Sequence, residues 1–442
     1  MSDIVSHKIH KALKVRIYPS EEQKAILSKT FGCCRVVYNE RLAEHISYYN
    51  TYKNNPNRPK FKGTLPKELR ENKYPWLGED AIAEALIQSQ RNCEQAYSNF
   101  FKSLKGQRKG KKVGRPKYKS KKSHKDSFTL CMIRKEGLVD FNSRTIFIPK
   151  LKDTKFRIAN SSLKSKWIEW FLEATPLSMT VSGNACGEYY CSILFEREQD
   201  LEQSIKLSNS AGLDFSPNSL YVDNNNNTAP NYKPYKQLNS KKLTKLQRSL
   251  ARKQKGSKNR EKARVKLARF EKHIADSRKD YIEKETLRLV RTYGVIGIED
   301  LNLQGMMKFS HSAKNYVDTS WYTFTQKLIW KSQFNDCIVI KSDRFYPSSK
   351  TCNHCGYVNK NLTLKDRKWI CPNCGTEIIR DQNAAQNLRD NAISLLVDEI
   401  TSTLGWGPSE VMSMEDMEAA YCNGALSGVS FEVEKRSSLV FS

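Results

Sequence analysis

Hydrophobic and polar residues alternate through residues 8–18, and this period of two predicts a β-strand near the start of the chain. Pro19 ends the alternating pattern. Ser20 and Gln23, three residues apart, have the pattern of a capping box, which marks the start of a helix. A helix is therefore expected directly after the first strand.

Apolar residues recur at helical spacing through residues 20–50 and again through 80–104. Residues 51–75 are polar and contain four prolines, so they are expected to form a loop or an interrupted helix. Residues 102–125 hold twelve Lys or Arg, a block that repels its own charges and is expected to be a solvated loop that orders on phosphate. We therefore predict a helical domain over residues 20–125. Its candidate nucleic-acid contacts are Lys109, Lys111, Lys112 and Arg115.

Short β-type segments separated by turn residues occupy residues 126–207, and apolar residues alternate with polar ones from Tyr189 to Phe195. This pattern predicts a small barrel or sandwich.

Apolar runs that resemble buried strands carry acids near their ends. One run ends near Asp214, and the run VIGIE ends in Glu299. Asp381 opens a helix rich in Ala and Leu, where an acid is equally consistent with a simple helix cap. Three such acids together predict a site for two divalent cations, and their oxygen ligands suit Mg²⁺. Asp214 would bridge both ions, and Glu299 and Asp381 would each complete one.

Residues 238–292 form two basic helical stretches with a hinge at Gly256–Ser257. Their basic side is consistent with a solvated helix face or with a nucleic-acid surface. The candidate contacts here are Arg248, Arg252 and Lys253. Residues 303–320 are polar and are expected to be a loop, followed by a helix and a strand. Arg380, next to Asp381, would either contact the scissile phosphate or brace a carboxylate.

Four cysteines form two C-x-x-C pairs separated by fifteen residues: Cys352, Cys355, Cys371 and Cys374. This spacing is typical of a zinc site in which four thiolates complete a closed, structural shell. Gly356 and Gly375 follow the second cysteine of each pair, where the turn needs room. Two disulfides or unrelated core cysteines are the alternative. The other eight cysteines are expected to be small core residues.

The net charge is +28, from 75 Lys and Arg against 47 Asp and Glu, and it favours a polyanionic partner. No apolar run approaches 18 residues, and the N-terminus has no signal-peptide pattern, so no membrane partner is expected. Residues 397–442 have no clear period, carry mostly acidic charge in their later part, and are expected to be a disordered tail.

The ordered motifs GLD, IGIEDLN, PSSKTCNHCG, CPNCG and RDQNAAQN resemble the TnpB (OrfB) family encoded by small bacterial transposons, which is related to compact type V CRISPR effectors. The resemblance extends over residues 8–393. It implies an RNA-guided DNA endonuclease with a RuvC-type core, with Asp214, Glu299 and Asp381 as catalytic acids and the cysteine quartet as its zinc ribbon. Two positions depart from the family pattern, because Phe215 is followed by Ser216 and Pro217 instead of glycine, and Ile379 replaces an acid.

The resemblance also implies the architecture, an α/β multidomain fold with a ribonuclease H-like (RuvC) core, a zinc-ribbon insertion, and a β-barrel wedge domain with an inserted helical recognition domain. The expected boundaries are wedge strand 1–19, recognition domain 20–125, wedge barrel 126–207, RuvC-like nuclease 208–345, zinc ribbon 346–376, last nuclease helix 377–396 and tail 397–442.

The expected function is Mg²⁺-dependent cleavage of target DNA directed by a guide RNA, with two Mg²⁺ ions and one structural Zn²⁺, in the cytoplasm of a bacterial or archaeal cell close to the nucleoid. The alternatives are a nucleic-acid-binding regulator that does not cut and, within nucleases, a compact type V CRISPR effector. A transposase is disfavoured because no histidine-hydrophobe-histidine motif is paired with a catalytic tyrosine.

Overall fold

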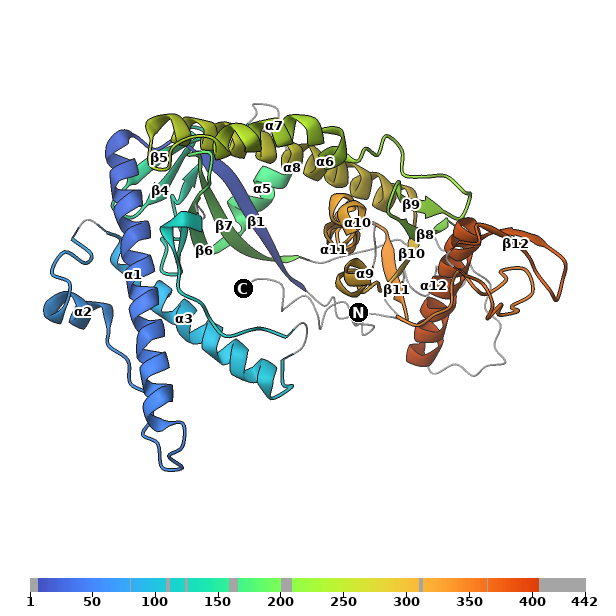
Figure 1. Ribbon diagram of the computed structural model, residues 1–442, viewed down its shortest axis with the longest axis horizontal. Helices are drawn as coiled ribbons and strands as arrows, with labels where there is room; N and C mark the ends of the chain where they lie inside the picture. The colour runs from blue at the N-terminus through green and yellow to red at the C-terminus, as the bar shows by residue number, and fades with distance from the viewer. Residues whose placement is uncertain are drawn as a thin grey trace, which may run out of the picture. The chain divides into compact units, whose positions relative to one another are not determined.

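The computed structural model describes residues 7–79, 81–108, 112–123, 126–158, 166–199, 209–309, 313–363 and 365–404 (Figure 1). The chain forms two compact units, one of residues His7–Gln199 and one that holds the described residues from 209 onward. Each unit has its own core. No helix in the described part of the chain is long and apolar enough to cross a membrane.

The first unit is built on a seven-stranded antiparallel sheet with the order β2-β6-β7-β1-β5-β4-β3. Its strands are β1 (His7–Ile17), β2 (Asp126–Leu130), β3 (Val139–Asp140), β4 (Thr145–Ile148), β5 (Lys152–Arg157), β6 (Thr175–Gly183) and β7 (Tyr189–Gln199). The first strand pairs with β7 along its whole length, from His7 opposite Gln199 to Ile17 opposite Tyr189. The helical segment between β1 and β2 is therefore an insertion between strands of one sheet.

The short strands predicted for residues 126–207 are confirmed, and the described strand pairs run from β2 at one end of the sheet to β3 at the other. The β3–β5 meander is attached to the end of β1, where Arg16 and Ile17 pair with β5 and the Tyr18 amide donates to the Lys155 carbonyl at 2.7 Å.

The inserted helices of the first unit are α1 (Glu21–Tyr52), α2 (Pro66–Asn72) and α3 (Ala83–Leu104), followed by η1 (Lys121–Ser123), and α5 (Lys166–Glu173) precedes β6. The predicted capping box is confirmed at the start of α1, where Ser20 and Gln23 exchange side-chain and backbone hydrogen bonds. α1 and α3 share a small core that contains Tyr38, Leu42 and Cys93.

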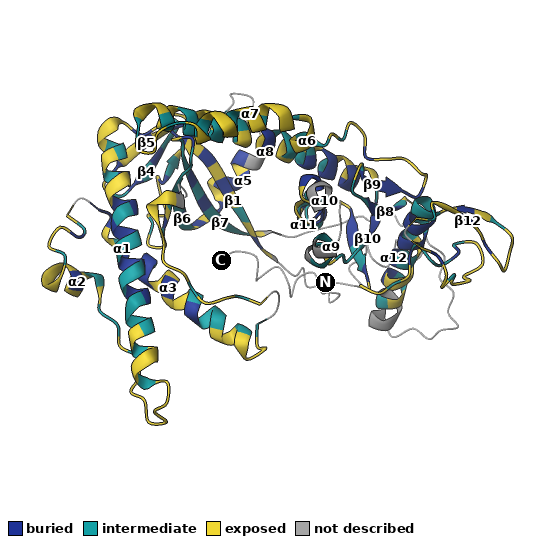
Figure 2. Ribbon diagram, in the orientation of Figure 1, coloured by how far each residue is buried: buried dark blue, intermediate teal, exposed yellow. Residues whose placement is uncertain are grey.

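The second unit is built on a four-stranded sheet with the order β11-β10-β8-β9. Its strands are β8 (Ser210–Ser216), β9 (Leu220–Asp223), β10 (Val295–Glu299) and β11 (Ile338–Ser342). The strands β8, β10 and β11 are parallel, and β9 runs antiparallel to β8. A parallel sheet needs cover on both faces, and Figure 2 shows its strands buried between helices.

One face of this sheet packs against α8 (Lys258–Thr292) and α11 (Trp321–Ser332) through a core that includes Ile296, Ile298 and Phe324. The other face is covered by α12 (Arg380–Leu404). Between β9 and α8 lie α6 (Tyr235–Leu238) and α7 (Ser240–Ala251). The predicted hinge is confirmed, because Gly256 has a φ of +86° and Ser257 caps α8 by accepting from the Arg260 backbone amide.

The prediction of a loop over residues 303–320 is wrong, because this segment forms the helices α9 (Leu303–Phe309) and α10 (Ala313–Thr319). Its polar residues suggested a loop, but two polar side chains stabilise helices here. The Asn302 side chain accepts from the Gly305 amide in the first turn of α9. Asp318, which is buried, pairs with Arg278 on α8 and accepts from backbone amides at the start of α6. These short helices are stabilised by capping and by a buried ion pair and not by a long apolar stripe.

Two further expectations differ from the structure. The last helix runs to Leu404, although the sequence boundary was placed at residue 396. The remainder of the expected tail, residues 405–442, lies outside the described residues. Cys131 is exposed, whereas the sequence assigned it to the core, because it follows the end of β2 at a turn.

Candidate active site

Asp214 and Glu299 lie on neighbouring parallel strands at corresponding positions. Gly212 on β8 is in register with Gly297 on β10, and Leu213 is in register with Ile298. The two acids come next along their strands. Because side chains alternate between the faces of a sheet, both acids point to the same face as the two glycines.

The helix α12 reaches this face at very close range because both glycines lack a side chain. A Cβ atom at Gly212 would lie 1.8 Å from the carbonyl oxygen of Ala385, and one at Gly297 would lie 2.1 Å from that of Leu388. The helix backbone therefore rests directly on the strand backbones. Asp381 stands in the first turn of α12, so this contact brings it to the same end of the sheet as the other two acids.

The three carboxylates influence one another electrostatically. The pKa of Asp214 lies well above its ordinary value because the group is buried and because Glu299 and Asp381 add negative charge, while Arg380 and Arg367 act in the opposite direction. Burial also raises the pKa of Glu299, and a hydrogen bond from Ser348 opposes this rise. The three sequence-predicted acids therefore lie at one end of the sheet and form an acidic cluster, in which Glu299 and Asp381 disfavour ionisation of Asp214.

Two arginines contact the Asp381 carboxylate. The Arg380 guanidinium donates to Oδ1 through Nε at 3.2 Å and through Nη2 at 3.1 Å, and its side chain is largely buried. The more exposed Arg367 donates through Nη1 to Oδ2 at 3.1 Å. In this structure Arg380 braces a carboxylate, which was one of the two roles expected for it. Arg367 was not predicted from the sequence, because it lies fourteen residues before Asp381 and meets it only across a hairpin.

That hairpin consists of β12 (Lys368–Ile370) and β13 (Glu377–Ile379). Arg367 and Asp381 both lie at the open end of this hairpin, because the backbone amide of Arg380, next to Asp381, donates to the Arg367 carbonyl at 3.0 Å. Its other end carries the second cysteine pair, since Cys371 directly follows β12. The hairpin therefore connects the cysteine cluster to Asp381.

A polar loop after β11 supports the same acids from another direction. The Ser348 hydroxyl donates to Glu299 Oε1 at 2.5 Å. The Asn387 side chain on α12 donates at 2.7 Å to the backbone carbonyls of both Ser348 and Thr351. Asn383, one turn earlier, donates to Thr351 and accepts from the Asn353 amide. These asparagines were missed from the sequence, although N-x-x-x-N on one helix face is a detectable signal of paired contacts.

The four cysteines of the quartet lie together, with all four Sγ atoms within 4.8 Å of one another. The Cys352–Cys374 and Cys355–Cys371 sulfur atoms are 3.7 and 3.6 Å apart. These separations are far too long for disulfides, and a tetrahedron with Zn–S bonds of about 2.3 Å has edges of about 3.8 Å. Gly356 and Gly375 have φ angles of +76° and +72°, as the knuckle turns require. The geometry thus fits a closed zinc site.

The thiols of this cluster differ in their acidity. Hydrogen bonds from Thr376 lower the pKa of Cys374 to about 6, and contacts with Asn373 and the Tyr357 amide lower that of Cys355. Burial raises the pKa of Cys352 to about 12. These contacts favour the thiolate form of Cys374 and Cys355, which is the form that binds zinc.

The chain is similar to named proteins along most of its length. A relative from Streptomyces pristinaespiralis, named "Putative RNA-guided DNA endonuclease", is 30% identical over 382 residues, which cover 86% of this chain and 89% of the relative. InsQ from Escherichia coli (strain K12), which carries the same description, is 27% identical over 85% of this chain and 91% of its own length. A mimivirus relative is named TnpB-like protein L770 and is 25% identical over 85% of this chain.

The chain belongs to the TnpB family. Family models described as "Probable transposase" (OrfB_IS605), "Cas12f1-like, TNB domain" and "Helix-turn-helix domain" match residues 192–310, 321–388 and 9–54. A cryo-EM structure of a Cas12f1–sgRNA–target DNA complex matches 86% of this chain and 99% of its own chain, at 13% identity and a TM-score of 0.49. The relative from Streptomyces pristinaespiralis and the family models confirm the family predicted from the sequence. The helix-turn-helix model would imply two helices over residues 9–54, but in this TnpB-family protein these residues form the strand β1 and the single helix α1.

The two departures from the TnpB pattern lie beside the acids without contacting them in the hydrogen bonds described. The Ser216 hydroxyl accepts from Ser219 at 2.8 Å at the end of β8. Ile379 pairs with Lys368 in the β12–β13 hairpin and is partly exposed.

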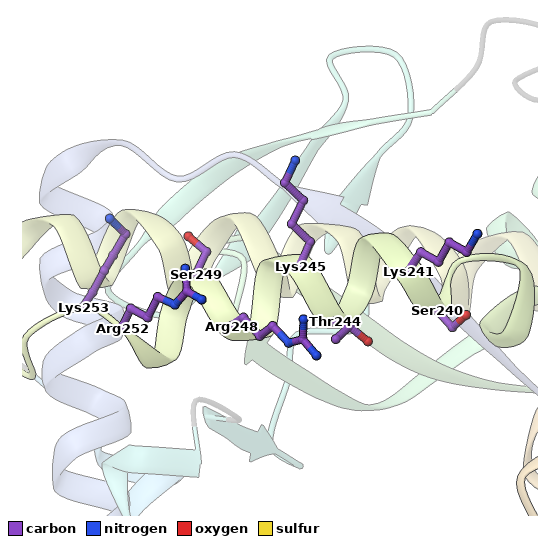
Figure 3. Close-up of a pocket in the computed structure, with 8 residues that line it drawn as sticks. All are labelled: Ser240, Lys241, Thr244, Lys245, Arg248, Ser249, Arg252 and Lys253. Atoms are coloured by element: carbon purple, nitrogen blue, oxygen red, sulfur yellow. The ribbon is translucent and has the colours of Figure 1, made fainter.

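The basic residues predicted to contact nucleic acid occur in both units. Arg248, Arg252 and Lys253 line an open groove of about 850 Å³ along α7. Figure 3 shows that its lining comes from successive turns of α7 and from Arg252 and Lys253, which directly follow this helix. The other residues that line it are Ser240, Lys241, Thr244, Lys245 and Ser249. In the other unit, Arg115 stacks over the Tyr49 ring and Lys112 is exposed. Lys109 and Lys111 lie outside the described residues.

Removal of one zinc ligand should detach the β12–β13 hairpin. Each strand has only three residues, too few to hold together without the metal. We expect Cys371→Ser to lose the bound zinc, measured as metal content by mass spectrometry, and to open the region around residues 350–380 to limited proteolysis. Cys131→Ser is the matched control, because Cys131 is exposed and outside the cluster. Full zinc content in Cys371→Ser would contradict the assignment.

Proposed function

We propose that this TnpB-family protein is an RNA-guided DNA endonuclease that hydrolyses phosphodiester bonds at the site formed by Asp214, Glu299 and Asp381. The observation that carries this proposal is the matched register of β8 and β10 beneath α12, which gathers three acids from distant parts of the chain. The names of its relatives support a guide RNA and a target DNA as partners. The net charge of +28 suits both polyanions.

The acidic cluster is suited to divalent cations. Carboxylate oxygens are the ligands that Mg²⁺ prefers. Burial and the neighbouring carboxylates Glu299 and Asp381 raise the pKa of Asp214, and bound cations would neutralise the negative charge of these groups. Two Mg²⁺ ions held by Asp214, Glu299 and Asp381 would activate a water and stabilise the leaving oxygen of a phosphodiester. Arg380 orients Asp381, and Ser348 orients Glu299. Zinc at the cysteine cluster would hold the hairpin that ends at Asp381.

The sequence-based domain organisation is part of the same proposal. The sheet of the first unit would be the wedge domain, α1–α3 the inserted recognition domain, and the second unit the RuvC-like nuclease with its zinc ribbon. The groove along α7 would contact phosphates of the guide or of the guide–target duplex, because Arg248 and Arg252 are exposed, Lys253 is partly exposed, and phosphate contacts need no base specificity.

The direct test is to purify the protein with its bound RNA, sequence that RNA, and assay cleavage of matching DNA with and without Mg²⁺. Cleavage that needs both Mg²⁺ and matching DNA is the expected result. Guide-dependent binding without cleavage would support a non-cutting regulator instead. The genomic source of the bound RNA would separate a transposon-encoded nuclease from a compact type V effector.

Arg367 is expected to compete with a divalent cation for Asp381. Its exposed side chain pairs with the carboxylate, and such pairs contribute little stability, so a cation can displace it. Arg367→Ala should therefore tighten Mn²⁺ binding by about two- to fivefold, measured by electron paramagnetic resonance. Lys368→Ala is the matched control, since Lys368 is equally exposed but pairs with Glu377. Equal Mn²⁺ affinities in the two variants would contradict this role.

A further inference from the structure

One aromatic side chain close to the acidic cluster is exposed to an unusual degree. Phe345 has 86% of its surface accessible, more than any other exposed large hydrophobic residue in the described part of the chain. It stands in the loop that leaves β11 and leads to Ser348. Isolated exposed apolar residues are common, so exposure alone indicates no function.

The backbone around Phe345 is held firmly, which distinguishes it from a mobile loop tip. On one side, the Arg344 guanidinium pairs with Asp300 at 2.5 Å. On the other side, Ser348 donates to Glu299. Asp300 directly follows Glu299, so both anchors attach this loop to the end of β10.

Hydrogen bonds within the loop complete this support. The Phe345 amide donates to Asp343 Oδ1 at 2.8 Å, and the Tyr346 amide donates to the Asp343 carbonyl at 3.1 Å. The Tyr346 hydroxyl donates to the Asn387 carbonyl on α12 at 3.3 Å. Every residue next to Phe345 is therefore anchored, and the phenyl ring is the part that projects into solvent.

The anchors also place the ring near the acids. Ser348 touches a carboxylate of the acidic cluster, and Phe345 is three residues away, so their Cα atoms are at most about 11 Å apart. A nucleic-acid strand whose phosphate lies at the acids presents its nearest bases within this range. Base stacking on aromatic side chains is tolerant of sequence, as a guide-directed enzyme requires.

We propose that Phe345 is a positioning residue that stacks on a nucleobase of the DNA strand beside the scissile phosphate. This inference rests on the proposed function, because it assumes that a DNA strand enters the acidic cluster. The ring would hold one base next to the cut while the acids engage the phosphate, and it would favour no particular base.

The test uses the purified protein with its bound RNA and a matching DNA that carries 2-aminopurine at single positions across the cut site. Stacking quenches this fluorophore, so binding without divalent cations should quench it at one or two positions. Phe345→Ala and Phe345→Leu should remove this quenching and raise KM about 5- to 50-fold, with kcat changed less. Phe345→Trp should retain both properties. Leucine is the informative replacement because it keeps the apolar bulk and loses only the aromatic ring.

Trp330→Ala is the matched control. Trp330 is a partly exposed aromatic residue near the end of α11, in the segment that leads to the start of β11. Glu299 is the last residue of the parallel strand β10, so Trp330 lies toward the opposite end of the strands. The Trp330→Ala variant should leave the quenching unchanged. Quenching that persists in Phe345→Ala at every position, or a Phe345→Leu enzyme with the wild-type KM, would overturn the proposal. A lower melting temperature of Phe345→Ala without DNA, with unchanged quenching, would show that the ring packs against the protein itself.

Failure of this inference can be told from failure of the proposed function. If the wild-type complex binds matching DNA and quenches the probe but never cuts, the stacking role stands and the nuclease assignment falls. If it cuts normally but Phe345→Ala changes neither KM nor fluorescence, only the stacking role is rejected.

Discussion

Asp214→Asn is expected to abolish DNA cleavage and, at the same time, to raise the melting temperature of the protein without divalent cations. Asparagine keeps the shape of the side chain but cannot supply the charge that the proposed metal site needs. The loss of cleavage should be on the order of 10³-fold or more, which corresponds to about 4 kcal/mol in the barrier. Binding of the guide RNA should persist, because Asp214 lies on a sheet face covered by α12.

The gain in stability follows from the raised pKa of Asp214. At low pH the carboxyl group is protonated in both folded and unfolded chains, so it costs nothing. As the pH rises through the ordinary pKa, the unfolded chain ionises first, and the folded state without divalent cations loses stability until the raised pKa is passed. Asn cannot ionise, so the variant escapes this loss.

The melting temperatures should therefore converge in acid and separate at neutral pH, with Asp214→Asn the more stable. Mg²⁺ should raise the melting temperature of the wild type and have little effect on the variant. The control is Asp336→Asn, which makes the same charge change at an exposed position just before β11. A variant that cuts at the wild-type rate, in a preparation free of other nucleases, would reject the assignment of Asp214.

Gly297→Ala should disrupt both the fold of the second unit and cleavage. The new Cβ would lie 2.1 Å from the Leu388 carbonyl oxygen and 3.0 Å from the Ala392 Cβ. The first of these is a backbone atom in the middle of α12, so the helix itself must move. Overpacking of this kind costs about 1–3 kcal/mol or more. The melting temperature should fall, and cleavage should fall further because Asp381 moves with α12.

Gly32→Ala is also a change from glycine to alanine, but it is expected to raise the stability of the protein. Gly32 lies within α1, and a Cβ there meets nothing within 4 Å. Alanine should stabilise that helix by up to about 1 kcal/mol. Thermal unfolding of both variants, together with cleavage assays, would measure the contrast. A Gly297→Ala protein as stable as the wild type would show that α12 does not rest on the strand as described.

The sequence was informative wherever the chemistry depends on a local pattern. The capping box at Ser20, the hinge at Gly256 and the cysteine spacing all use residues a few positions apart, and the structure has each of them. The expectation that the three acids would come together came from their places at the ends of predicted elements and from the family resemblance. The physical reason for it, the register of Gly212 with Gly297, appears only in three dimensions.

The sequence was misleading or silent where long-range contacts decide the outcome. Residues 303–320 look like a loop because their stabilising partners, such as Arg278 for Asp318, lie on other helices. Arg367 looked like one more surface charge in a basic chain, because its pairing with Asp381 depends on the β12–β13 hairpin. The place at which β5 joins β1 in the first unit, at Arg16 and Ile17, also depends on a long-range pairing that no period in the sequence records.

The paired positions of Asp214 and Glu299 have a consequence for how this protein can change. Substitutions at many places in β8 and β10 leave both carboxylates on the α12 side of the sheet. Deletion or insertion of a single residue before either acid would turn that carboxylate toward the apolar core around Phe324, and would bring a hydrophobic neighbour out in its place. The two-residue spacing from the glycine to the acid in each strand must therefore be kept, whereas the identity of the residue between them can vary more freely.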